Sequence, residues 1–499
     1  MTEGKPPDSP ATGANLSSLE LEGRILRNTG WVALSLGAKQ VGSMLALFVL
    51  ARILDPKDFG LVALAWTVLY FINQIQETGL GQALIYRRTD VEAAAASVLI
   101  YALLLGVLGY IAVFAASPLA ARFFHAPDLV DVLRVMALVL VLRGVGVVPG
   151  AILERSLDFR SRTIAELVAT FTQIGTFIAL AIAGFGVWSL VIGYLVFEGV
   201  QSALYWMFVP WRPSPRRRSR AILVELIRYG RFVGATNVLT VVSNTIDNIV
   251  IGRVLGTSSV GLYSVAFRLA DFPNSVVGHT VGRTMFSIYS MLQDDLASFR
   301  HAYVRNLERV ALLAVPISVG LLVAAEPIVL ALLGETWLPA VPALRILAVC
   351  GLIKSFGALS AEALKGIGAP HWPFVLSNVY LAVAIPALVV LTPRFEITGA
   401  AVSILIAVAS VSLPMVAITA RMLDLTALDL ARTLAPSAFC SALLAATLGA
   451  LLSQSDSMGP AGSLVLLGSV GLVVYVLATA LFARRVVVPM WLSLRSGRE

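Results

Sequence analysis

Charged residues are scarce in this chain of 499 residues. Lys, Arg, Asp and Glu make up 13% of the sequence, whereas soluble globular domains carry about 25%. Hydrophobic residues account for 58%, which is more apolar surface than a fold in water can hide. The composition therefore excludes an ordinary soluble protein and indicates one that spans a lipid bilayer.

Residue patterns that carry enzyme chemistry are missing as well. The two cysteines, Cys350 and Cys440, fall inside apolar stretches and provide neither a disulfide framework nor a zinc-binding spacing. The four histidines lie far apart, at His125, His279, His301 and His371. The sequence contains no glycine-rich phosphate-binding loop with a lysine. We therefore expect no catalytic residue, no bound metal, no cofactor and no ATP hydrolysis.

The chain does have about fourteen apolar stretches, each long enough to cross roughly 30 Å of hydrocarbon. Most of the 37 basic residues lie in every second loop, which predicts that these loops and both termini are cytoplasmic. The opposite loops hold only Arg52, Lys57, Arg122, Arg253 and Arg394. Because the basic residues are spread over many turns, the net charge of +8 indicates topology and not a nucleic-acid partner. Residues 11–26 lack the pattern of a removable signal peptide, so we expect the first span to stay in the membrane.

The first part of the chain is repeated in the second. Residues 51–65 (ARILDPKDFGLVALA) match residues 252–266 (GRVLGTSSVGLYSVA) at an offset of 201, so that Arg52 corresponds to Arg253 and Gly60 to Gly261. Six spans separate the two copies, so both insert in the same direction, related by an axis along the membrane normal. We therefore predict an all-α polytopic membrane protein with two pseudo-symmetric six-helix bundles and two additional C-terminal helices, an architecture typical of transporters.

The repeat and the proline- and arginine-rich stretch at 210–220 set the predicted domain boundaries, because prolines interrupt helices and clustered arginines hold a loop in the cytoplasm. The predicted parts are a cytoplasmic N-terminal segment (1–30), an N-terminal lobe (31–209), a basic cytoplasmic linker (210–230), a C-terminal lobe (231–420), two additional transmembrane helices (433–483) and a cytoplasmic tail (484–499).

Three segments resemble a known family: residues 51–88, the turn LERSLDFRSR at 153–162, and residues 246–273. They are similar to the bacterial polysaccharide flippases of the multidrug/oligosaccharidyl-lipid/polysaccharide exporter superfamily, above all to its exopolysaccharide, colanic acid and teichuronic acid exporters. The resemblance implies two bundles in a V shape and alternating access. It also implies a cargo of undecaprenyl-pyrophosphate-linked oligosaccharide for exopolysaccharide or lipopolysaccharide biosynthesis. The implied partners are membrane lipids, this cargo, and polysaccharide polymerase and export machinery.

The resemblance supplies no ligand residues, so candidate site residues come from the polar positions within the spans. A charge at the bilayer centre is costly unless it is paired or faces a wet cavity. Lys39 in the first span fits either a cationic site for pyrophosphate or a structural salt bridge. Asn73, Gln74 and Glu77 in the second span offer hydrogen bonds either to sugars or to neighbouring helices.

The seventh span carries a stripe of asparagines. Asn237, Asn244 and Asn248 fall within about 40° of one another on a helical wheel, with Asp247 to one side and Val241 on the same face. Three amides on one face favour a cavity wall over helix packing.

Charged residues complete the candidate set. In the eighth span, Arg268 and Asp271 are three residues apart and can pair along the helix, or open so that Arg268 binds phosphate. The other intramembrane charges considered are Arg143, Lys354, Glu198 and Asp247. The last two fit either carboxylates that couple transport to a proton or sodium gradient or counter-ions to nearby arginines. The symmetry of Arg52 and Arg253 favours a structural role at a turn over ligand binding.

Three other functions compete with glycolipid flipping. A multidrug exporter of the same superfamily would favour a more acidic or aromatic cavity, whereas Lys39, Arg143, Arg268 and Lys354 favour an anionic cargo. A membrane-embedded polysaccharide polymerase or ligase would need a sizeable extramembrane loop with catalytic residues, and the predicted outer loops are short. A non-transporting scaffold for glycan assembly would have no use for the asparagine stripe.

Overall fold

The computed structural model describes residues 37–76, 84, 90–213, 241–277, 283–455 and 459–482. Within these ranges every regular element is a helix. Nine helical segments of the described chain are long and apolar enough to cross a membrane, and Gly37–Ala51 is a shorter apolar helix. The prediction of an all-α, multi-pass membrane protein is therefore confirmed.

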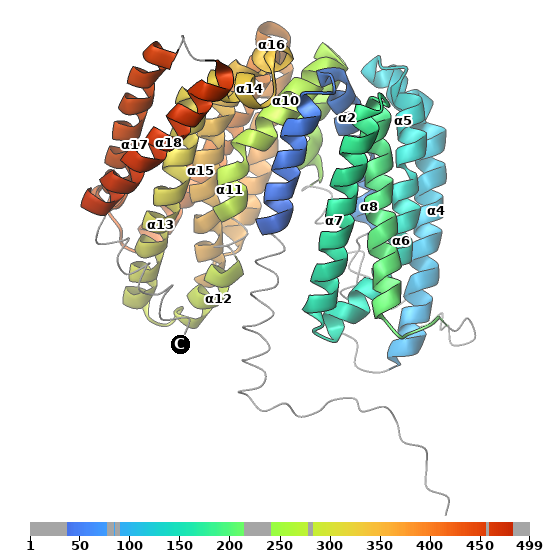
Figure 1. Ribbon diagram of the computed structural model, residues 1–499. Helices are drawn as coiled ribbons and strands as arrows, with labels where there is room; N and C mark the ends of the chain where they lie inside the picture. The colour runs from blue at the N-terminus through green and yellow to red at the C-terminus, as the bar shows by residue number, and fades with distance from the viewer. Residues whose placement is uncertain are drawn as a thin grey trace, which may run out of the picture.

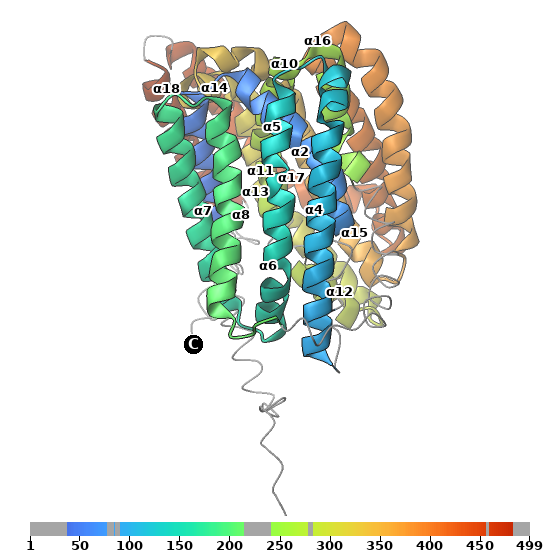
Figure 2. The same cartoon turned by 90° about the vertical axis from the view of Figure 1, so that its right-hand side faces the viewer.

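The N-terminal lobe consists of the helix Gly37–Ala51, α2 (Pro56–Gln76), α4 (Val91–Phe124), α5 (Leu129–Met136), α6 (Leu138–Arg155), α7 (Phe159–Ile182) and α8 (Val187–Phe208). Together α5 and α6 form one membrane crossing. Asp158 caps the start of α7 by accepting a hydrogen bond from the backbone N–H of Ser161. Figure 2 shows α7, α8, α5 with α6, and α4 in a row on the near side.

The C-terminal lobe consists of helical residues 241–255, α10 (Thr257–Ala270), α11 (Phe272–Val277), α12 (Arg283–Met291), α13 (Leu296–Val323), α14 (Ala325–Leu332), η3 (Glu335–Ala340), α15 (Val341–Gly366) and α16 (His371–Met422). The long α16 bends at Phe395 and Glu396, whose backbone angles are not helical, so it is two crossings joined by a turn. The additional helices α17 (Ala427–Ser455) and α18 (Pro460–Phe482) pack against α13 and α14 on the outside of this lobe (Figure 1).

The two lobes meet at one end and diverge at the other, which gives the molecule a V shape (Figure 1). At the joined end α2 packs on α10, and one buried core runs through both lobes, including Leu64 and Tyr263. At the open end each lobe has its own core, around Leu84 in one and around Phe299 in the other. Among the described residues, the shared apolar core therefore joins the lobes at the closed end of the V, and each lobe has a separate core at the other end.

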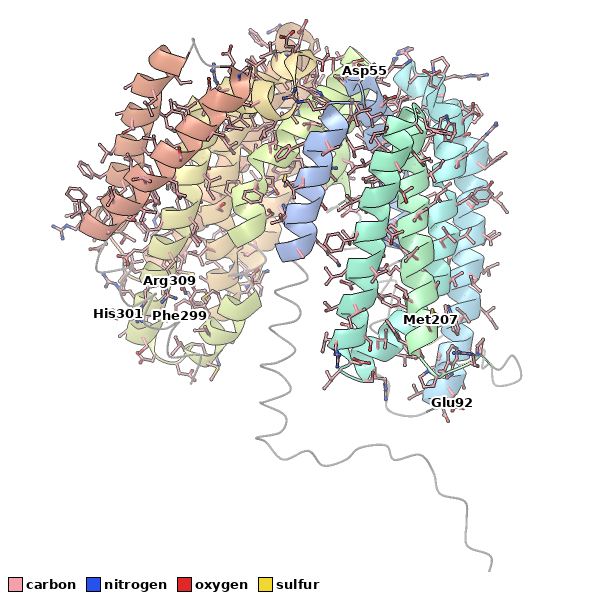
Figure 3. All side chains as sticks on the ribbon, viewed as in Figure 1. Asp55, Glu92, Met207, Phe299, His301 and Arg309 are labelled. Atoms are coloured by element: carbon pink, nitrogen blue, oxygen red, sulfur yellow. The ribbon has the colours of Figure 1, made fainter. Side chains whose placement is uncertain are left out.

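Labelled side chains mark the two ends in Figure 3. Asp55 lies at the joined end. Glu92 and Met207 lie at the open end of the N-terminal lobe, and His301 and Arg309 at the open end of the C-terminal lobe.

Candidate substrate cavity

A cavity of about 1030 Å³ lies between the two lobes. Its N-terminal wall comes from the helix Gly37–Ala51, α2, α7 and α8, and its C-terminal wall from residues 241–255, α10, α11, α15 and α16. This volume is at the upper end of the usual range for small-molecule sites, about 300–1,000 Å³. The cavity is large enough for a ligand of several ring-sized groups.

Asp271 and Lys354 form an ion pair on the C-terminal wall. The Lys354 ammonium nitrogen lies 3.0 Å from Asp271 Oδ1, and Asn274 donates a hydrogen bond of 3.2 Å to the same oxygen. The sequence suggested that Asp271 pairs with Arg268 along the helix; the structure corrects this. Asp271 is the C-terminal cap of α10, and its carboxylate is directed to α15, where Lys354 reaches it.

Arg268 is left as a cation facing the cavity. Its side chain is exposed and lines the space between the lobes. No ion pair or hydrogen bond joins it to another residue of the described chain. An unpaired guanidinium in a membrane cavity is a binding group for an anion, because its planar fork accommodates two oxygens of a phosphate.

The asparagine stripe only partly follows the helical-wheel prediction. Asn244, Asn248 and Asp247 line the cavity, whereas Val241 is 1% exposed and packs inside the lobe. The amide oxygen of Asn248 is buried without a hydrogen-bond partner among the described residues. Asn237 lies outside the described residues, so its place in the stripe stays a prediction.

Asp247 is 8% exposed and is held by neutral groups. The Tyr263 hydroxyl donates a hydrogen bond of 3.2 Å to Oδ2, and the backbone N–H of Asn248 donates one of 2.8 Å to Oδ1. In the part of the chain that the structure describes, no salt bridge joins this carboxylate to a basic side chain. It is therefore a buried carboxylate at the cavity wall that lacks a direct cationic partner.

The N-terminal wall has a different chemistry. Its polar and aromatic members are Gln40, Ser43, Trp66, Thr67, Tyr70, Gln173 and Tyr194. Sequence reasoning did not select Trp66, Tyr70, Gln173 or Tyr194 as site residues, because aromatic residues in an apolar span also fit lipid contact. The lone amide of Gln173 in the apolar span 163–183 was the available signal.

Lys39 does not line the cavity and belongs to an ionic network within the N-terminal lobe. Its ammonium group binds the carboxylate of Glu166 on α7. Glu166 also lies 3.1 Å from Arg162 Nε and accepts a hydrogen bond of 3.3 Å from the Tyr205 hydroxyl. The salt-bridge interpretation of Lys39 therefore describes its contacts, and Glu166 is the partner that the sequence did not identify.

Other predicted site residues also lie away from the cavity. Arg143 forms an ion pair of 3.2 Å with Glu198, whose side chain is 6% exposed. Asn73 is buried, and its amide oxygen has no partner within the described ranges. Gln74 is half-buried and absent from the cavity wall, and Glu77 lies outside the described residues.

At the joined end of the molecule, two arginines each reach the opposite lobe. Arg52 donates hydrogen bonds to the carbonyl oxygens of Leu330, Ala331 and Leu332 at the end of α14. Arg253 lies with its guanidinium 5.5 Å from the Phe123 ring and donates to the ring of His125, at the end of α4, over 2.7 Å. These repeat-related residues make their contacts across the lobes and not within a turn; the structural role suggested by their symmetry stays a prediction.

Comparison with known proteins finds relatives that are named for polysaccharide biosynthesis. A family described as polysaccharide biosynthesis protein matches residues 49–342. A succinoglycan biosynthesis transport protein of Rhizobium meliloti is 29% identical over 345 residues, 69% of either chain. A lipopolysaccharide biosynthesis protein of Escherichia coli is 24% identical over 349 residues, covering 70% of this chain and 71% of its own. A teichuronic acid biosynthesis protein of Bacillus subtilis is 25% identical over 336 residues, covering 66% and 69%.

Solved structures share the fold. A lipid II flippase in an inward closed conformation has a TM-score of 0.74 at 12% identity, covering 91% of this chain and 99% of that one. An inward-facing multidrug resistance transporter has a TM-score of 0.59 at 20% identity, covering 77% and 94%. At these identities the likeness shows the two-lobed fold alone, and function has to be argued from the cavity.

Proposed function

The chain belongs to the polysaccharide biosynthesis protein family, and from this premise we propose that it is a flippase for oligosaccharides linked to undecaprenyl pyrophosphate. It moves them from the cytoplasmic to the outer leaflet of the bacterial inner membrane, where polysaccharide polymerase and export machinery receive them. The observation that carries the proposal is Arg268, a cation on the cavity wall whose side chain has no ion-pair partner among the described residues. No bond in the cargo is made or broken, so no catalytic residue is required.

Alternating access fits the V shape. The open end carries basic residues of the α6–α7 turn and the start of α13, including Arg155, Arg160, Arg300 and Arg305, and such residues resist translocation. We therefore assign the open end and both termini to the cytoplasm. In this orientation the structure is inward-open, with the outer end closed by Arg52 and its repeat partner.

We assign gradient coupling, to protons or sodium ions, to Asp247. This carboxylate is buried in the cavity wall and held by the neutral groups of Tyr263 and Asn248. Because no basic side chain among the described residues forms a salt bridge with this carboxylate, it is available to take up a proton or a sodium ion. Glu198 is the less suitable carboxylate, because Arg143 already neutralises it.

Arg268→Gln tests the function. Loss of charge-assisted hydrogen bonds worth about 1.5 to 3 kcal/mol should weaken cargo binding roughly ten- to a hundredfold. Cells should then accumulate lipid-linked glycan on the inner leaflet at normal protein abundance. Arg345→Gln is the matched control, because Arg345 is outside the cavity wall and 4.0 Å from Glu326. Normal glycan export by Arg268→Gln would contradict the anionic cargo and would favour the multidrug alternative.

A further inference from the structure

The two walls of the cavity differ in charge. Within the described chain, the charged side chains that line it are Asp247, Arg268, Asp271 and Lys354, and all four belong to the C-terminal lobe. The facing residues of the N-terminal lobe include none. We call Trp66, Tyr70, Gln173 and Tyr194 of that lobe the aromatic wall.

Ring packing holds Tyr194 in the aromatic wall. Trp66 meets Tyr194 edge to face, with ring centroids 5.1 Å apart and planes at 81°. Phe177 also meets Tyr194 edge to face, at 5.5 Å and 73°. Because Tyr194 packs against two rings, these contacts restrict its rotamer, and the wall presents a fixed ring to a ligand at this point.

The polar groups of the aromatic wall remain available. No hydrogen bond joins the Trp66 ring N–H, the Tyr70 hydroxyl, the Gln173 amide or the Tyr194 hydroxyl to any other residue that the structure describes. The wall therefore offers ring faces together with unused donors and acceptors. It offers no carboxylate to balance an organic cation and no ammonium or guanidinium for phosphate.

Neutral saccharides match this combination. A pyranose ring has an apolar face of C–H groups that packs on aromatic rings, and its rim of hydroxyls exchanges hydrogen bonds with phenol and amide groups. A phosphate would instead favour the opposite wall, where Arg268 is exposed.

We propose that the aromatic wall is the saccharide subsite of the cavity, so that the cargo lies between the lobes with its pyrophosphate on Arg268 and its first sugars on Trp66, Tyr70 and Gln173. This proposal rests on the proposed function. Its consequence is specificity: the bare lipid pyrophosphate touches one lobe, whereas the glycolipid touches both. Only the glycolipid then stabilises a closed arrangement of the two lobes, because a ligand shifts an equilibrium by its differential contacts.

The test uses two kinds of probe lipid, undecaprenyl pyrophosphate and the same lipid bearing one hexose, with glucose and galactose tried in parallel. Binding is measured on the purified full chain in lipid nanodiscs. Tyr70→Phe and Gln173→Ala should weaken binding of a hexose-bearing lipid about three- to tenfold and leave the affinity for the bare lipid unchanged. Tyr110→Phe and Gln201→Ala, which change the same residue types outside the cavity wall, should alter neither affinity.

Three outcomes separate the inferences. Equal losses for both kinds of lipid, or no loss with either hexose, would overturn the saccharide subsite. Arg268→Gln should weaken both lipids alike. If it weakens neither while the Tyr70 and Gln173 variants still lose only the hexose-bearing lipid, the pyrophosphate contact fails and the saccharide subsite stands. Each variant is first required to match the wild type in thermal unfolding midpoint, so that misfolding does not mimic a loss of binding.

Discussion

Gly60 and Gly261 face each other where α2 crosses α10. A methyl group on Gly60 would lie 1.8 Å from the carbonyl oxygen of Thr257, and one on Gly261 would lie 1.8 Å from that of Pro56. The two glycines occupy equivalent positions in the repeat, so the contact is nearly symmetric. Only a hydrogen atom fits on either side, and the backbones of the two lobes touch at this point.

Gly60→Ala should therefore weaken the closed outer end. Overpacking typically costs about 1 to 3 kcal/mol, so the equilibrium should move roughly five- to a hundredfold toward conformations with this end apart. Spin labels at Lys57 and Ser258, which are exposed at repeat-equivalent positions, would report the separation. Gly175→Ala is the control, because outside its own helical backbone and chain neighbours no atom of the described residues lies within 4 Å of an added methyl group there. An unchanged distance distribution in Gly60→Ala would show that the crossing is not tight.

The arginines that cross between the lobes should act in the same direction. Arg52→Gln and Arg253→Gln each remove exposed hydrogen bonds at a helix end, worth about 1 kcal/mol. Each should shift the equilibrium that the same labels report about fivefold toward the separated state. The double variant should shift this equilibrium further. Arg122→Gln should have no effect, since Arg122 is exposed at the same end and its side chain makes no hydrogen bond to another described residue. If Arg122→Gln also opened the outer end, the effect of the Arg52 and Arg253 variants would come from the loss of positive charge and not from their hydrogen bonds.

Lys39→Ala should lower the stability of the protein and leave transport by the folded molecules unchanged. Its partner Glu166 keeps Arg162 but loses one cation, and the pair is partly exposed at 27% and 19%. The expected loss is about 1 to 2 kcal/mol, seen as reduced membrane abundance. Adding Glu166→Gln should recover the abundance. Normal abundance with failed export in Lys39→Ala would instead indicate a contact with the cargo.

Asp247→Asn should abolish the coupling of transport to an ion gradient without abolishing the binding of the cargo. The amide keeps the size of the side chain and can still accept a hydrogen bond from Tyr263, so cargo affinity should change little. Flipping in proteoliposomes should no longer accelerate when a proton or sodium gradient is imposed. Glu198→Gln is the comparison, and it should reduce abundance because Arg143 loses its partner at 3.2 Å. Continued acceleration in Asp247→Asn would place the coupling group elsewhere.

Cysteine accessibility should distinguish the cavity face of residues 241–255 from its packed face. Asn244→Cys should react rapidly with a small hydrophilic thiol reagent, because this position is exposed to the cavity. Val241→Cys should be protected, since Val241 is 1% exposed. Both are made in a chain whose native Cys350 and Cys440 are replaced by alanine. Equal reactivity would mean that the helix turns about its axis in the membrane.

Local patterns in the sequence determined the class of protein and its internal repeat. Apolar run lengths predicted the spans, and the 201-residue offset paired Gly60 with Gly261 before any contact between them was visible. A helical wheel placed Asn244 and Asn248 on one face, and both line the cavity. These properties repeat along one helix or along the chain, so periodicity alone reveals them.

The tertiary structure alone decided which charges meet. Asp271 had a plausible partner three residues away in Arg268, yet it binds Lys354 on α15. Lys39 binds Glu166, 127 positions along the chain, and thereby leaves the set of cavity cations. Ion pairs depend on distances between helices, which neither spacing nor hydropathy encodes. The same lobe packing left Arg268 unpaired among the described residues and placed it opposite the uncharged aromatic wall.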